Sequence, residues 1–144
     1  MGHPESGKSI APGWYALTGD LVMILIFAIV GRLSHDMEMT VAGILQTAVP
    51  FVTAWIVTGV VLGLYRVPAV TRFSHAWRST VLVTAVSVPI ALVIRAYQLN
   101  EGAVVVLFQL VSWVGLLLFM LPWRLVLAAL YSGKKEKPTR GVVS

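Results

Sequence analysis

Four long apolar runs divide the sequence, and short polar segments separate them. Each run is long enough for a helix, at about 1.5 Å rise per residue, to cross a hydrocarbon core of about 30 Å. The pattern predicts membrane-spanning helices at residues 14–32, 41–65, 76–95 and 103–131. The fold class that follows is all-α: an integral membrane four-helix bundle with short connections between antiparallel neighbours.

The two ends of the chain differ from this transmembrane domain, which covers residues 14–131. Residues 1–13 contain several Gly and Pro without an apolar period, so we expect a flexible N-terminal tail. Residues 132–144 are rich in lysine and predict a basic C-terminal tail. The first span runs into Gly-Arg-Leu-Ser-His rather than a small-residue cleavage site, so we expect it to be retained.

Composition supports a membrane protein and excludes several other classes. The chain is 58% hydrophobic and 12% charged, whereas a typical soluble domain is about 25% charged. The net charge is +5, but Lys and Arg lie between and after the apolar runs, which indicates membrane topology and not nucleic-acid binding. The absence of cysteine excludes disulfides and thiolate sites. The expected partner is therefore the lipid bilayer.

The distribution of basic residues predicts the orientation. Arg66 and Arg72 lie in the second connection, and the C-terminal tail is basic, whereas each of the other two connections combines one arginine with acids. By the positive-inside rule, both termini are expected to be cytoplasmic. An inner belt of aromatic side chains fits the same orientation: Trp14, Tyr65, Trp77 and Tyr131.

One acid and one base are candidates for an ion pair inside the bilayer. Asp20 lies six residues past Trp14, and Arg124 lies seven residues before Tyr131 on the last span. Both charges are therefore about 10 Å from the inner belt, at matching depth. The favoured interpretation is a structural clamp between the first and last helices; the other is a proton or ion relay, or part of a ligand site.

A second polar group is expected near the outer surface. Arg32, His35 and Asp36 have i, i+3 and i+4 spacing, which places them on one helical face. Arg95 and Glu101 reach the same surface from the third connection. The group could form a polar mouth, with His35 as a ligand or pH switch. The favoured alternative is that both arginines bond the last carbonyls of the spans they end.

Small residues predict close helix packing. The third span carries Thr80, Thr84, Ser87 and Ala91 at helical spacing, and the second ends in Gly59-x-x-x-Gly63. Such patterns let helices approach closely within a membrane. A weak repeat at an offset of 63 residues also suggests a duplicated hairpin, although any two hairpins of equal length would place Trp and Arg similarly.

The residue inventory argues against an enzyme. The three histidines, His3, His35 and His75, lie in the N-terminal tail and at opposite membrane surfaces, so no two can ligate one haem. The sequence has no phosphate-binding loop, no acids at metal-binding spacing, and no Ser/His/acid set at one depth. We expect no catalytic residues, metal or cofactor, although this inventory does not test for a quinone or lipid site.

Several short motifs resemble one family of membrane proteins. They are the run Asp20 to His35 with its Gly-Arg-x-Ser-His ending, Thr47-Ala48-Val49-Pro50-Phe51, Arg95, and Trp123-Arg124. Over residues 18–127 the chain resembles the four-span family catalogued as domain of unknown function 3054, found in bacteria and haloarchaea. Ile94 and Pro122 depart from the family pattern, which has Leu and Gly there. The resemblance implies four spans in a prokaryotic plasma membrane and no assigned activity. It directs attention to Asp20, Arg32, His35, Pro50, Arg95 and Arg124.

Two functions follow as hypotheses. The leading one is a non-enzymatic accessory or scaffold subunit that packs against a larger membrane complex or against its own copies. Small-residue stripes would provide its contact surfaces. The alternative is a small transporter or channel that uses the Asp20 and Arg124 pair together with the outer group of Arg32, His35 and Arg95.

Overall fold

The computed structural model describes residues 11–100 and 106–134, and these residues form five helices. The helices are α1 (Ala11–Ser34), α2 (Val41–Val61), α3 (Val67–Thr71), α4 (Phe73–Gln98) and α5 (Val106–Lys134). All except α3 are long and apolar enough to cross a membrane. The all-α prediction with four spans is confirmed, and the chain is a multi-pass membrane protein.

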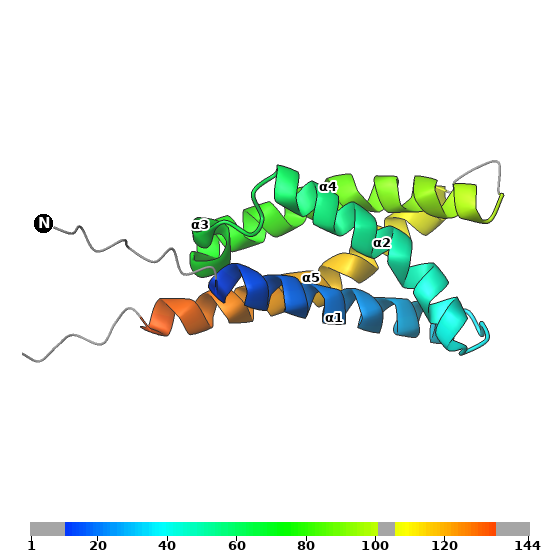
Figure 1. Ribbon diagram of the computed structural model, residues 1–144, viewed down its shortest axis with the longest axis horizontal. Helices are drawn as coiled ribbons and strands as arrows, with labels where there is room; N and C mark the ends of the chain where they lie inside the picture. Colours follow the sequence, from blue (N-terminus) through cyan, green and yellow to red (C-terminus); the bar gives the residue numbers. More distant parts are fainter. Residues whose placement is uncertain (1–10, 101–105, 135–144) are drawn as a thin grey trace, which may run out of the picture.

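The four long helices form a bundle in which each one packs against two others (Figure 1). Helix α4 packs against both α2 and α5, while α1 packs against α5 and α2. The start of α1, the short helix α3 and the end of α5 lie together at one end of the bundle (Figure 1). Because four spans cross the membrane, the start of the first and the end of the last must lie on the same side. The cytoplasmic position of that end stays a prediction.

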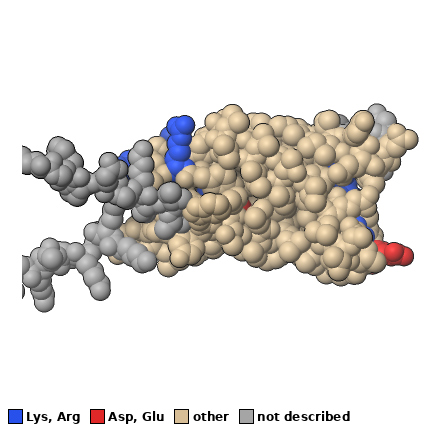
Figure 2. All heavy atoms as spheres, viewed as in Figure 1, with Lys and Arg blue, Asp and Glu red and all other residues tan. Residues whose placement is uncertain are grey.

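The core is apolar and draws on every long helix. Its main cluster is centred on Trp55 and Phe51 of α2, which pack with Ile24 of α1, Val88 of α4 and Leu116 of α5. The outward faces carry branched aliphatic side chains, for example Val57, which is 56% exposed. Along its length the visible surface is almost free of charge; Lys and Arg atoms show near both ends, and most of the visible acidic atoms lie at one of them (Figure 2). Such a surface suits contact with lipid.

Several element boundaries differ from the predicted ones, and α4 is extended at both ends, to Phe73–Gln98. Helix α1 begins at Ala11, so residues 11–13 are helical rather than part of a flexible tail, and residues 1–10 lie outside the described part. Helix α5 continues to Lys134, and residues 135–144 lie outside the description. The connection at residues 66–75, which is too polar to span, contains the short helix α3. Pro68 lies in the first turn of this helix, where proline is favoured.

The second span ends earlier than predicted because of a glycine turn. Helix α2 stops at Val61, and Gly63 has φ +73°. The Leu64 N–H donates to the Gly59 carbonyl (2.7 Å), and the Gly63 N–H donates to the Val60 carbonyl (3.2 Å). These two bonds define a Schellman motif, in which glycine adopts the left-handed conformation. Gly63 therefore terminates the helix and does not continue a packing stripe, whereas Gly59 is buried and packs closely against Leu64 and Tyr65.

The small-residue stripe of α4 faces the interior. Thr80, Thr84, Ser87 and Ala91 are all buried. The Thr80 hydroxyl donates to the Ala76 carbonyl (2.7 Å), and the Thr84 hydroxyl donates to the Thr80 carbonyl (2.7 Å). These threonines therefore satisfy their hydroxyls within α4 and bring small surfaces to the neighbouring helices.

Candidate functional site

A buried carboxylate on α1 lies at the centre of the first site. Asp20 is fully buried, and Arg124 of α5 is 1% exposed. The Arg124 Nε donates to Asp20 Oδ1 (2.9 Å), and its Nη2 forms an ion pair with Asp20 Oδ2. This bidentate geometry is the strongest pairing available to a carboxylate. The structure thus brings together the two charges that the sequence placed at matching depth.

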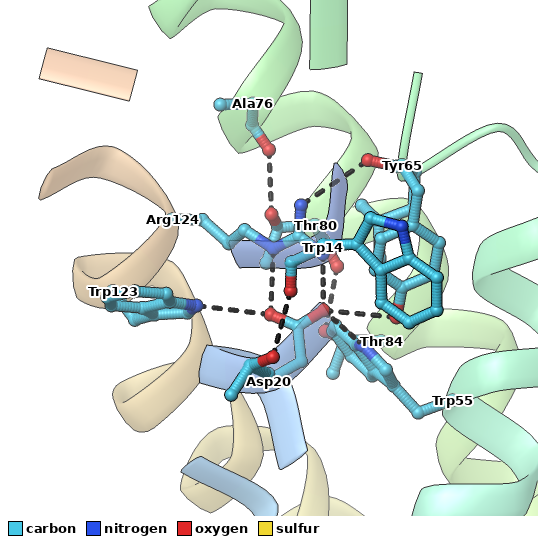
Figure 3. Close-up of polar contacts among 11 residues, drawn as sticks. Trp14, Asp20, Trp55, Tyr65, Ala76, Thr80, Thr84, Trp123 and Arg124 are labelled. Atoms are coloured by element: carbon cyan, nitrogen blue, oxygen red, sulfur yellow. Dashed lines mark hydrogen bonds and ion pairs between the residues drawn. The ribbon is translucent and has the colours of Figure 1, made fainter. Parts of the chain in front are cut away.

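Three aromatic side chains complete the surroundings of this carboxylate (Figure 3). The Trp55 indole N–H (2.9 Å) and the Tyr65 hydroxyl (3.1 Å) donate to Asp20 Oδ2. The Trp123 indole N–H donates to Oδ1 (3.2 Å). We call Asp20, Trp55, Tyr65, Trp123 and Arg124 the Asp20 cluster. It joins α1, α2, the connection after α2, and α5.

Part of this cluster does not follow from the sequence. No sequence motif marks Trp55, and Tyr65 is predicted in an aromatic belt at the membrane surface, whereas its hydroxyl points inward to Asp20. The reason is the turn at Gly63, which ends α2 and directs the chain back over the bundle. Trp14 is exposed, as a belt residue would be. The available signal for Trp123 was its position next to Arg124.

The same turn gives Arg124 further partners. Its Nη1 donates to the Leu64 carbonyl (3.3 Å), and its guanidinium carbon lies 5.3 Å from the centre of the Tyr65 ring, in a cation–π contact. Burial raises the pKa of the Tyr65 phenol, and the negative charge of Asp20 raises it further. Tyr65 therefore remains a hydrogen-bond donor at neutral pH.

The Asp20 cluster is electrically neutral and internally satisfied. A carboxylate offers about four lone-pair positions, and Asp20 accepts five hydrogen bonds from four residues. An ion or substrate approaching Asp20 would have to displace one of these donors. The arrangement is thus suited to holding helices together.

The second candidate group, at the other end of the bundle, is arranged differently from the expectation. Arg32 is 7% exposed. Its Nε (3.1 Å) and Nη2 donate to the Glu38 carbonyl, and its Nη1 donates to the Thr47 hydroxyl (3.2 Å). Arg32 therefore connects α1 to the following turn and to α2. The expectation that Arg32 bonds the last carbonyls of its own helix is wrong.

His35 and Asp36 do not share a helical face with Arg32. Helix α1 ends at Ser34, and Asp36 has φ +50° in the following turn. Both side chains are exposed. The His35 ring lies 6.4 Å from the Phe108 ring, and the Arg95 guanidinium carbon lies 5.9 Å from the centre of that same ring. Glu101 lies outside the described residues.

A cavity of about 250 Å³ brings part of this group together. Phenylalanines from three helices form much of its apolar lining: Phe27, Phe51, Phe108 and Phe119. Its polar lining comes from Arg32, His35, Thr47, Arg95 and Ser112, together with Ser34. The cavity thus collects Arg32, His35 and Arg95 of the predicted outer group, and Asp36 does not line it. We call it the outer cavity, because we expect this end of the bundle to face outward.

Comparison with known proteins places both sites inside the region that one family model matches. Residues 17–127 match DUF3054, a family described as proteins of unknown function. The chain belongs to the DUF3054 family. The match begins three residues before Asp20 and ends three residues after Arg124. No curated protein and no solved structure matches the chain.

The two DUF3054 sites differ in their charge balance. In the Asp20 cluster, a buried guanidinium is paired with a buried carboxylate. At the outer cavity, Arg32 is also buried, but its hydrogen-bond acceptors are a backbone carbonyl and a hydroxyl. Among the residues that the structure describes, no Asp or Glu forms an ion pair with Arg32. The first site is electrostatically complete, whereas Arg32 of the second has no carboxylate partner among the described residues.

Proposed function

We propose that this DUF3054 protein is a non-enzymatic accessory or scaffold subunit in the plasma membrane of a prokaryote. It packs against a larger membrane protein or against further copies of itself. The prokaryotic membrane is inferred from the family resemblance of the motifs around Asp20 and Arg124. The observation that carries the structural role is the Asp20 cluster, in which the charges of Asp20 and Arg124 are already bound to protein groups.

This cluster favours a scaffold over a transporter. Charged groups on a transport path pair with substrates or change partners near the midplane of the membrane. Asp20 is instead held by donors from α2, α5 and the connection after α2, so exchange of its partners would loosen three parts of the bundle at once. A residue with this many fixed partners supports a rigid bundle.

A groove between α1 and α5 supports the binding of a partner. It encloses about 570 Å³ at the end of the bundle that contains α3. Thr18 and Gly19 line it together with larger apolar residues: Tyr15, Val22, Met23, Trp123, Leu127, Leu130 and Tyr131. The Trp123 ring packs directly over Gly19, whereas Thr18 is exposed in the groove, and a small residue at such a position lets another transmembrane helix approach closely. We therefore assign this groove to a helix of the partner protein.

The test is purification of the tagged chain from its native membrane in mild detergent. We expect a stoichiometric membrane partner or a defined homo-oligomer. Thr18→Trp fills the groove and should reduce partner recovery. Val57→Trp adds the same side chain at an exposed position of α2, and should not.

Two outcomes would overturn the proposal. One is a stable monomer for which Thr18→Trp and Val57→Trp behave alike. The other is ion or solute transport by the reconstituted chain alone that Asp20→Asn abolishes, which would make the chain a small transporter or channel.

A further inference from the structure

The outer cavity combines a buried cation with an apolar interior. We propose that it binds an anionic membrane lipid, with the acidic head at Arg32 and the first carbons of the tail between the phenylalanines. The shared chemistry is a carboxylate or phosphate joined to an acyl chain. This inference is independent of the accessory role, because the partner groove lies at the other end of the bundle.

The charge of Arg32 is the first argument. Burying an ion without a counter-ion is unfavourable, because the neutral groups around it replace only part of its hydration. Arg32 is 7% exposed, and its three hydrogen bonds go to the Glu38 carbonyl and the Thr47 hydroxyl. No carboxylate of the described residues compensates it. An anion in the cavity would supply the missing charge.

The geometry of the guanidinium is the second argument. A guanidinium has five N–H donors in a planar fork. The hydrogen bonds of Arg32 use one N–H on each of its three nitrogens, so one N–H on Nη1 and one on Nη2 remain. Two such donors match a pair of carboxylate or phosphate oxygens.

A second polar side chain lies in the same cavity. Ser112 of α5 is 3% exposed and lines the cavity. A serine hydroxyl can both donate and accept a hydrogen bond. Ser112 can therefore donate to a ligand oxygen in the cavity.

The order of residues along the helices gives the cavity an amphipathic shape. Arg32 lies at the end of α1, whereas Phe27 lies deeper in the bundle on the same helix. Phe119 likewise lies deeper along α5 than Phe108, which contacts His35 and Arg95. A head group would thus lie near the membrane surface while its tail points toward the bilayer interior.

Size and access also fit a lipid. A cavity of about 150 Å³ accepts benzene, and small-molecule pockets begin at about 300 Å³. The outer cavity, at about 250 Å³, therefore holds a head group or a short stretch of chain and not a complete lipid. Val30 and Val111 line it and are also exposed on the outer surface of α1 and α5. The remaining tail can leave between these helices into the bilayer.

Photolabelling of the reconstituted chain tests the proposal. The full chain is placed in phosphatidylcholine nanodiscs with a trace of one photoactivatable probe: a fatty acid, a phosphatidylglycerol, or a phosphatidylcholine, each with a diazirine near the head end of the acyl chain. Peptide mass spectrometry maps the adducts. We expect an acidic probe to label the cavity lining about tenfold more than phosphatidylcholine does, a difference of about 1.4 kcal/mol. The acidic probe that labels more strongly identifies carboxylate or phosphate as the head.

Matched variants separate specific binding from general attraction. Arg32→Gln should reduce labelling by the acidic probe to the phosphatidylcholine level, whereas Arg72→Gln removes an exposed charge at the other end and should not. Ser112→Met fills the cavity while retaining Arg32, so it keeps the test decisive if Arg32→Gln fails to fold. Its control is Val114→Met on the exposed face of α5.

Three results would overturn the proposal. The first is equal labelling by the acidic and zwitterionic probes. The second is adducts spread over the lipid-facing surface and unaffected by Ser112→Met. The third is labelling of the cavity by a photoactivatable quinone, unchanged in Arg32→Gln, while both acidic probes fail.

Discussion

Separating the two charges of the Asp20 cluster should destabilise the protein, and removing both should cost less than the sum. Asp20→Asn keeps the shape of the side chain but leaves the buried Arg124 guanidinium without a counter-ion. Arg124→Gln leaves a buried carboxylate, which still accepts hydrogen bonds from Trp55, Tyr65 and Trp123. The two single changes therefore differ in how many donors remain to stabilise the stranded charge.

The structure sets the expected magnitudes. Breaking a buried pair by removing one partner costs about 3–5 kcal/mol of unfolding free energy. Arg124→Gln should lie near the lower value, because three neutral donors still bond the carboxylate. Asp20→Asn should lie near the upper value, since Arg124 would keep only neutral partners: the new amide oxygen, the Leu64 carbonyl and the Tyr65 ring. The double change removes the stranded charge, so it should cost at least about 2 kcal/mol less than the sum of the single changes.

The measurement is reversible unfolding in mixed micelles, in which SDS is titrated into maltoside detergent and helix content is followed by circular dichroism. The free energies of the four proteins form a double-mutant cycle. Independent sites add to within about 0.5 kcal/mol. Additivity of Asp20→Asn and Arg124→Gln at that level would refute the clamp. Equal costs for the two single changes would refute the role that we assign to the aromatic donors.

Three further predictions concern single positions. Burial raises the pKa of Tyr65 in the folded state. The protonated Tyr65 therefore stabilises the fold fully below pH 10, and as the pH rises further the free energy of unfolding falls by about 1.4 kcal/mol per pH unit. Unfolding titrations from pH 8 to 11.5 should show this slope for the native chain and a shallower one for Tyr65→Phe; identical slopes would contradict the assignment. Gly63→Ala should destabilise by about 1–2 kcal/mol because of its positive φ, whereas Gly31→Ala, in open space on α1, should be neutral or stabilising. In membranes, a cysteine at Glu38 should react with an impermeant reagent from outside and one at Ser74 should not; the reverse labelling would invert the topology.

The spans and the ion pair could be predicted from the sequence because both depend on distance along a helix. Hydropathy over about 20 residues defines a membrane crossing with little reference to tertiary contacts. The depth of a residue follows from counting at about 1.5 Å per residue from the membrane surface. Residue counting therefore predicts one depth for Asp20 and Arg124 without any knowledge of packing, and the structure brings them together.

The aromatic partners could not be predicted in this way because they depend on helix rotation and on one turn. Trp55 reaches Asp20 only because α2 presents that face to α1, and depth counting contains no rotational information. Tyr65 reaches it because Gly63 adopts positive φ and redirects the chain. The Gly59-x-x-x-Gly63 spacing fits a packing stripe and a helix terminus equally well at the level of sequence. Only the backbone hydrogen bonds distinguish the two.

The two buried arginines show why burial alone does not separate a structural residue from a binding residue. Arg124 and Arg32 are both buried side chains of long helices, and both bond a backbone carbonyl of a connecting segment. What differs is the counter-ion: Arg124 has Asp20, whereas Arg32 has only neutral acceptors within the described residues. A paired buried charge stabilises one fixed arrangement of the helices. An unpaired buried charge is stabilised by an anion that binds to it. Arg32 lines a cavity that phenylalanines surround and that is accessible from the lipid. The anion that binds there should therefore carry an acyl chain.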